Sequence, residues 1–355
     1  NPPAYHVYSA ALLSMLEEVA PDLVGPSARK VIEEQGQYLR ALVAPDGDVA
    51  LAGRSQLQSW TLAAVAVVAA SRMTGPEAPE WRELGNRSLA RLSGREYRDR
   101  TGVFAITPSA RGQTLSGIDS YAFPVTYNGL SLMFLEQAAR GWRDSVQSAD
   151  GVAADADGFW ADLEGSRLIA ARAGTVWWQW LAAPGSSDVR DGSGLVQVKV
   201  GGSEGWRDLL EARPLGTSAG EAGPTLIRGR KSLPFRATSV RADGDALVLN
   251  GSWTSAGSTP VAGSIRVAAD TDRGSIVLRW TARAGVVFSG CVPLSAGVAR
   301  ANVLRSGRTT VSVGAGVRFS AGRSAPSASS ARTKMHCWRG PTPASGVNTL
   351  TIGGG

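Results

Sequence analysis

The sequence contains few of the residues on which several common chemistries depend. It has two cysteines, Cys291 and Cys337, and two histidines, His6 and His336, among 355 residues. No CxxC or mixed Cys/His spacing typical of a zinc site is present. Walker and dinucleotide-binding motifs are also missing. We therefore expect no metal site, no cofactor and no serine-hydrolase mechanism.

Long apolar runs are missing as well. The longest mainly apolar run, from Trp60 to Ala70, is shorter than a bilayer-spanning helix requires, so we expect no membrane span. The first residues form no leader in which an apolar stretch follows positive charge. Either a signal peptide has been removed or the chain is part of a longer protein.

Lysine is scarce, and arginine supplies nearly all of the positive charge. The formal net charge is +7 and the pI is about 9.8. This balance favours an anionic partner, although an Arg-, Ala- and Gly-rich composition is also typical of a GC-rich genome. The arginines are scattered and are not interleaved with aromatic residues, so nucleic acid is the less favoured partner. An acidic glycan or an anionic surface is the more favoured partner.

The first part of the chain shows helical periodicity. Apolar residues recur at helical spacing in five segments, which predict five helices. The third and fifth are apolar on nearly every side and are expected to be buried, whereas the second and fourth are amphipathic and should lie outside. These segments are residues 12–19, 27–42, 55–68, 79–92 and 128–138. Alternating inner and outer helices are typical of an α/α-hairpin array, here an incomplete toroid.

After about residue 150 the pattern changes to short apolar runs bounded by Gly, Asp, Ser or Pro, which are typical of strands. We predict an α+β protein with an α/α helical domain over residues 1–148, a linker over 149–158 and an antiparallel β-sandwich domain over 159–355. Cys291 and Cys337 both lie in the β-rich half, and we expect them to form a disulfide. That expectation fits a secreted or cell-surface protein.

Three polar clusters lie at the starts of the first, third and fifth helices. They occupy residues 1–6, 53–60 and 121–130. In an antiparallel array the odd-numbered helices begin at the same end, so the three clusters are predicted to meet at one mouth. Helix N-termini present unpaired N–H groups and partial positive charge, which favour an anion such as a uronate carboxylate.

The residue types at this mouth fit proton abstraction beside a carboxylate. Arg54 can bind the carboxylate through two hydrogen bonds. Gln56 or Asn128 can donate hydrogen bonds that neutralise it and acidify the neighbouring C–H. Tyr127 or His6 can remove that proton or protonate the leaving oxygen.

Other residues of the mouth are predicted to contact substrate. Trp60 and Tyr121 offer rings on which a sugar can stack, and Asp119 lies close to the third cluster. Structural roles are the alternative for four residues of the mouth: packing or capping for His6, packing for Tyr127, and hydrogen bonds to loop carbonyls for Arg54 and Gln56. The triplet Trp177, Trp178 and Trp180 is expected to lie in a core.

The combination of an α/α helical domain, a following β-sandwich and Asn/His, Arg/Gln and Tyr-Asn clusters at helix starts resembles the toroid-plus-sandwich polysaccharide lyases. These enzymes act on chondroitin, hyaluronan, heparin or alginate. The resemblance implies β-elimination of a uronate polysaccharide, with Asn128 or Gln56 neutralising the carboxylate and Tyr127 or His6 moving the proton.

Two alternatives remain at this level. A glycoside hydrolase on the same scaffold needs two carboxylates flanking the scissile bond, and Asp48 and Asp119 are the available pair. A secreted glycan-binding protein without catalysis is the other.

Overall fold

The structure is a computed structural model that describes residues 3–49, 57–94, 97, 104–108, 124–144, 157–164, 167–182, 194–211, 223–295, 297–325 and 333–354. The chain divides into two compact units, Asn1–Ala156 and Asp157–Gly355, here called the helical unit and the β unit. The division falls inside the predicted linker. It is an α+β protein, with helices in the first unit and antiparallel sheets in the second. Among the helices described, none has the length and apolar character needed to cross a bilayer.

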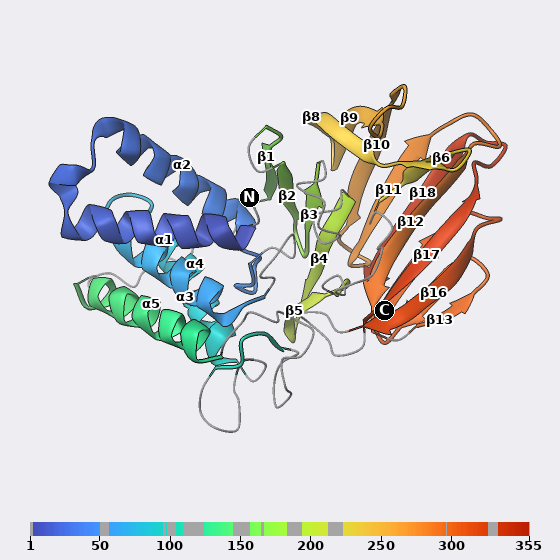
Figure 1. Ribbon diagram of the computed structural model, residues 1–355. Coiled ribbons are helices and arrows are strands. Elements are labelled where there is room, and N and C mark those ends of the chain that lie inside the picture. Colours follow the sequence, from blue (N-terminus) through green and yellow to red (C-terminus); the bar gives the residue numbers. More distant parts are fainter. Residues whose placement is uncertain are drawn as a thin grey trace. The chain divides into compact units, whose positions relative to one another are not determined.

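The described part of the helical unit contains five α-helices and one short 3-10 turn (Figure 1). Four of the helices, α1, α2, α4 and α5, carry proline at their first or second residue, where a helix needs no backbone N–H donor. The elements are α1 (Pro3–Val19), η1 (Pro21–Leu23), α2 (Pro26–Leu42), α3 (Ser59–Ser71), α4 (Ala78–Ser93) and α5 (Pro124–Asp144).

The core of the helical unit is built around α3. Every residue of this helix from Ser59 to Ala69 is buried, because α1, α4 and α5 all pack against it. The amphipathic helices α2 and α4 bury one side only, as predicted. The prediction of a buried fifth helix is wrong for one side of α5, since Leu132 and Met133 are 60% and 40% exposed. Of the helices described, only α3 packs extensively against α5, so its opposite side meets solvent.

The strands of the β unit form three antiparallel sheets (Figure 1). The first has the order β1-β2-β3-β4-β5 and contains β1 (Gly158–Asp162), β2 (Leu168–Ala173), β3 (Val176–Leu181), β4 (Gly194–Gly202) and β5 (Gly205–Asp208). The second has the order β13-β14-β15-β18-β11-β10-β9-β8. It contains β8 (Phe235–Asp243), β9 (Ala246–Trp253), β10 (Val261–Asp270), β11 (Ser275–Thr281), β13 (Val298–Arg300), β14 (Val303–Ser306), β15 (Thr309–Val313) and β18 (Val347–Gly354).

The third sheet has the order β16-β17-β12-β6-β7. Its strands are β6 (Thr225–Arg228), β7 (Lys231–Leu233), β12 (Val287–Leu294), β16 (Arg318–Ala325) and β17 (Thr333–Pro341). Its inner face packs against the second sheet through aromatic rings. The Trp280 ring lies 5.9 Å from that of Trp338, and the Phe288 ring lies 5.4 Å from that of Trp253. Successive residues of a strand point to opposite faces, so every second side chain enters this core.

Trp177, Trp178 and Trp180 of β3 are 6%, 2% and 0% exposed, which confirms the expected core position of this triplet. Cys291 of β12 and Cys337 of β17 lie directly opposite each other in the third sheet and form a disulfide. The bridge closes a loop between residues 46 apart in the sequence.

His336 is a buried titratable group of the β unit. It lies on β17 and is 1% exposed, and its Nε2 atom has no hydrogen-bond partner. Burial, and next the positive charge of Lys334, lowers the pKa of His336 below its usual value of 6.5. The folded chain therefore takes up this proton at a lower pH than the unfolded chain does.

We expect the β unit to lose stability as the pH falls below about 6.5, because the unfolded histidine then binds a proton and the folded one does not. The free energy of unfolding should fall by at most about 1.4 kcal/mol per pH unit from this residue alone. Urea unfolding between pH 7.5 and 5.5 measures the slope, which His336→Gln should flatten. His6→Gln is the matched control, and an equal flattening there would contradict the assignment.

Candidate functional site

The helices α3 and α5 run parallel and begin side by side. The rings of Trp60 and Tyr127, both in first turns, are stacked with centroids 6.4 Å apart and planes 16° apart. Near the other ends, a Cβ on Gly141 would lie 2.9 Å from the Cβ of Ala70, so glycine permits this close approach. The third and fifth helices therefore bring their N-termini to one end of the helical unit (Figure 1).

The residues that precede and open α3 are held by buried hydrogen bonds. Trp60 Nε1 donates to the side-chain oxygen of Gln58, which is fully buried. The hydroxyl of Tyr97 donates to the carbonyl of Leu57 at 3.0 Å. Leu57 has a φ of 50°, a left-handed conformation that costs a non-glycine residue energy and is found where the surroundings enforce it. The first turn of α3 is thus rigidly positioned.

Asn128 has a defined orientation near the start of α5. Its Oδ1 accepts a hydrogen bond from the backbone N–H of Phe104 at 3.1 Å. A backbone N–H can only donate, so the carbonyl end of the side chain is the end that it holds. The Nδ2 group, which carries two donors, is therefore the end of Asn128 directed away from Phe104.

The start of α1 joins this cluster through a residue that was not predicted. The ring of Tyr8 lies edge-on to Trp60, with centroids 5.8 Å apart, and to Phe134, at 6.1 Å. His6 instead lies edge-on to Tyr38 of α2, with centroids 4.7 Å apart. Residues two apart on a helix differ by about 200° in direction, so His6 and Tyr8 face different neighbours. The structure does not show His6 in contact with Trp60 or Tyr127.

The role of Trp60 differs from the predicted sugar platform. Its side chain is only 3% exposed, because the rings of Tyr8 and Tyr127 cover it. Trp60 is therefore suited to support the ring of Tyr127, and a sugar cannot reach its face in this conformation. The other predicted binding residues, Arg54, Gln56, Tyr121 and Asp119, lie outside the described residues.

A buried ion pair joins the end of α4 to the segment that follows α2. Arg91 Nε, at the end of α4, donates to Asp48 Oδ1 at 2.7 Å, and Asp48 is fully buried. The Arg91 guanidinium also lies over the ring of Tyr97, 5.9 Å from its centroid. Burial alone would lower the pKa of Arg91, but the charge and hydrogen bond of Asp48 raise it above the ordinary arginine value. No spacing in the sequence indicates this pair, since 43 residues separate its members.

The pair should contribute to stability through its burial. Arg91→Gln leaves the Asp48 carboxylate without its strongest partner and is expected to lower the free energy of unfolding by about 3 kcal/mol. Arg140→Gln removes an exposed arginine paired with Glu136 and should cost about 0.5 kcal/mol or less. Urea denaturation of both variants checks the difference, and similar losses would show that burial does not strengthen the Arg91 pair.

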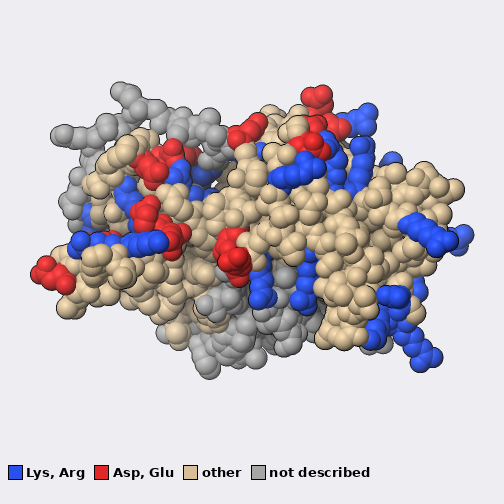
Figure 2. Space-filling view, turned by 90° about the horizontal axis from the view of Figure 1, so that it is seen from above, with Lys and Arg blue, Asp and Glu red and all other residues tan. Residues whose placement is uncertain are grey.

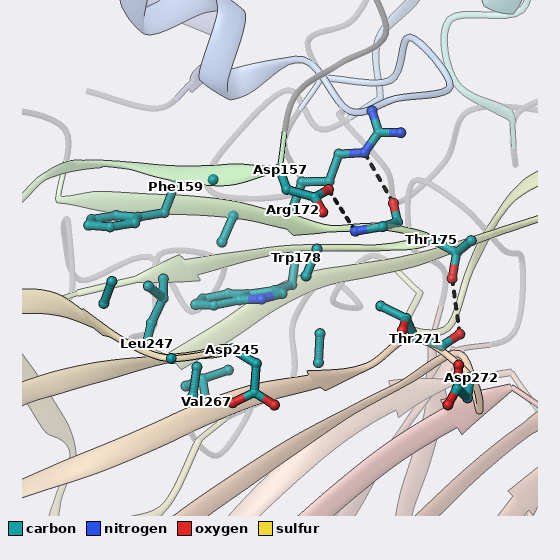
Figure 3. Close-up of a pocket in the computed structure, with 18 residues that line it drawn as sticks. Asp157, Phe159, Arg172, Thr175, Trp178, Asp245, Leu247, Val267, Thr271 and Asp272 are labelled. Carbon is teal, nitrogen blue, oxygen red and sulfur yellow. Dashed lines mark hydrogen bonds between the residues drawn. The ribbon is translucent and has the colours of Figure 1, made fainter.

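The β unit contains a cavity of about 800 Å³ (Figure 3). It lies between β1–β3 and β8–β10. The floor is apolar and includes Trp178, Leu247 and Val267, which are all buried. Phe159 of β1, which is 42% exposed, lines the cavity as well.

The polar lining of this cavity does not fit an anionic ligand. Three carboxylates, of Asp157, Asp245 and Asp272, line it together with one guanidinium, that of Arg172. Asp157 accepts a hydrogen bond from the N–H of Gly174 at 2.7 Å, and Arg172 donates to the carbonyl of Gly174 at 3.2 Å. These groups bond to the protein, and the excess of negative charge repels a uronate. The start of α3 and α5 is the better candidate for such a ligand.

No family model matches the chain, and no curated protein sequence matches it. Among solved structures, a heparinase III with methylated lysines has 12% identity and a TM-score of 0.42 over 98% of this chain and 58% of that one. Another heparinase III has 13% identity and a TM-score of 0.39 over 98% of this chain and 60% of the other. A 4-alpha-glucanotransferase from Thermococcus litoralis has 9% identity and a TM-score of 0.41 over 83% and 49%. This chain thus spans about half to three fifths of each, and similarities this low carry no functional argument.

Proposed function

We propose that the protein is a polysaccharide lyase that cleaves a uronate-containing polymer by β-elimination. The observation that carries this proposal is the pairing of Tyr127 and Asn128 at the adjoining starts of α3 and α5. Tyr127 is held by its stacking on Trp60, and Asn128 is turned so that its Nδ2 donors face away from Phe104. A phenol and an amide donor on consecutive residues are the groups that elimination beside a carboxylate requires.

Asn128 would act on the uronate carboxylate. Its Nδ2 hydrogens can bond to a carboxylate oxygen and withdraw electron density, which makes the C5–H bond of the sugar more acidic. The partial positive charge at the N-termini of α3 and α5 stabilises the same negative charge as it grows. Arg54 and Gln56 precede α3 in the sequence and are proposed as further carboxylate ligands.

Tyr127 would move the protons. Its phenolate oxygen takes the proton from C5 of the uronate, and the electron pair of that bond forms the C4–C5 double bond. The C4–O bond breaks, and the leaving oxygen takes a proton from the phenol. The products are a new sugar end and an unsaturated uronate. Since His6 packs against Tyr38, we favour Tyr127 over His6 for this role.

The contacts of Asp48 disfavour the glycoside hydrolase. That mechanism needs two carboxylates that reach the glycosidic bond. Asp48 is fully buried and bound to Arg91, so this carboxylate has a partner within the protein and does not meet a sugar. The other carboxylate of the pair, Asp119, lies outside the described residues.

We also propose that the helices belong to an α/α array and that the facing sheets form a sandwich, the architecture of the toroid-plus-sandwich lyases. Export from the cytoplasm is proposed on the disulfide between Cys291 and Cys337, since such bonds persist in oxidising compartments.

Ultraviolet absorbance tests the proposed chemistry, because elimination creates a conjugated double bond and hydrolysis does not. The protein should raise the absorbance of at least one polymer among alginate, hyaluronan, chondroitin, heparan and glucuronan. Tyr127→Phe should slow that rise by about 10²–10⁴-fold, since it removes the proton-transferring group and keeps the ring that stacks on Trp60. Asn128→Ala should slow it by about 10²–10³-fold.

Tyr38→Phe is the matched control, because Tyr38 of α2 lies outside the three polar clusters and the change again removes only a hydroxyl from a ring. Its rate should equal that of the unchanged protein. Full activity in Tyr127→Phe would contradict the assignment of the proton transfer to this residue. New reducing ends without an increase in absorbance would indicate a hydrolase instead.

A further inference from the structure

The charge of the β unit is distributed very unevenly along the sequence. Asp272 is the last Asp or Glu in the sequence, whereas Arg and Lys continue to Arg339. The strands β11 to β18 therefore carry positive charge without negative charge of their own. Figure 2 shows the result, since the right-hand end of the β unit displays Lys and Arg and no Asp or Glu on the face in view.

Two of these arginines are cross-strand neighbours. Arg318 of β16 lies directly opposite Arg339 of β17, and both are exposed. Directly opposite residues of antiparallel strands share a face and have Cβ atoms about 5 Å apart, so two like charges there destabilise the sheet. Within the part of the chain that the structure describes, neither guanidinium has an acidic partner.

Another arginine pair of the β unit shows how such a cost is usually relieved. Arg266 of β10 lies opposite Arg279 of β11. Arg266 forms ion pairs with Asp243 and with Asp245, the latter at 3.3 Å. Among the described residues, no acidic side chain supplies such a counter-charge to Arg318 or Arg339. A bound anion would supply it.

The surroundings of the Arg318–Arg339 pair are rigid and carry a further donor. Ser289 of β12 lies opposite Arg339 on the other side, so two guanidiniums and a hydroxyl form one row across three strands. The disulfide between Cys291 and Cys337 joins β12 to β17 beside this row, on the same face. A site that is already rigid loses little conformational entropy when it binds a ligand.

We propose that this row, Arg318, Arg339 and Ser289, is a second binding site for anionic polysaccharide on the outer face of the third sheet. Guanidinium binds a sulfate or carboxylate through two parallel hydrogen bonds, which favours arginine over lysine at such a site. A row along one sheet face suits an extended polymer with repeated charges. Nucleic acid fits less well, because Trp253, Trp280 and Trp338, the described tryptophans of the second and third sheets, are buried in the core and offer no face to a base. The choice of polymer rests on the proposed function, but the site does not depend on Tyr127.

The test measures binding in a Tyr127→Phe background, so that cleavage does not deplete the polymer. The probes are heparin, which carries sulfates and carboxylates, hyaluronan, which carries carboxylates only, and dextran, which is neutral. Arg318→Gln with Arg339→Gln should weaken the binding of heparin, of hyaluronan or of both by roughly tenfold or more, since each change removes a charged hydrogen-bond donor. Binding to one probe only identifies the anionic group, and dextran should not bind.

Arg279→Gln with Arg305→Gln is the matched control. It removes the same charge from exposed residues of the same unit that are not cross-strand neighbours of each other. An equal loss of binding in the control would overturn the proposal, because general charge would then explain the affinity. Tighter binding of single-stranded DNA than of either polysaccharide would overturn it as well.

Turnover separates this site from the proposed active site. With Tyr127 restored, Arg318→Gln with Arg339→Gln should raise the KM for long polymer and leave the turnover of short oligosaccharides unchanged. Should elimination prove absent, the binding comparison still decides the proposal by itself. Slower turnover of short oligosaccharides in this variant would contradict a site separate from catalysis.

Discussion

The burial of α3 is the constraint on which the candidate active site depends. This helix is apolar on every side and therefore requires other helices around it. Packing α5 parallel to it places Trp60 and Tyr127 ring against ring. The polar residues beside those rings, Asn128 above all, then lie where two helix N-termini meet. A buried helix thus sets the position of groups that themselves contribute little to the core.

In the β unit, the alternation of side chains along a strand separates the residues that pack in the core from the charged residues on the outer face. On β17, Trp338 enters the core against Trp280, while the adjacent Arg339 projects from the outer face beside Arg318. The aromatic side of the strand provides stability, and the charged side is available to a ligand. Because one strand carries both, the position of the arginine row is as well defined as the core beneath it.

Hydrophobic periodicity predicted much of the fold. It did so where local pattern alone decides whether a segment is helix or strand and which residues are buried. Five helices occur in the predicted order, and the tryptophan triplet of β3 is buried. The exposed side of α5 was not predicted, because an apolar helix is buried only where partners reach it. The placement of His6 beside Tyr38, and of Tyr8 beside Trp60, was also outside the reach of the sequence. Both residues lie in the same polar helix start, and the direction of each depends on where the neighbouring helices pack.

The sequence by itself determined which segments are helix or strand, because hydrophobic spacing along the chain reflects the 3.6-residue and two-residue periods. It also placed polar groups at the starts of the first, third and fifth helices. Only the tertiary structure decided which of these groups meet and how they are turned. The contact of Phe104 with Asn128, the Arg91–Asp48 pair and the Arg318–Arg339 row all join residues distant in sequence. Such contacts follow from packing and strand register, which no local pattern encodes.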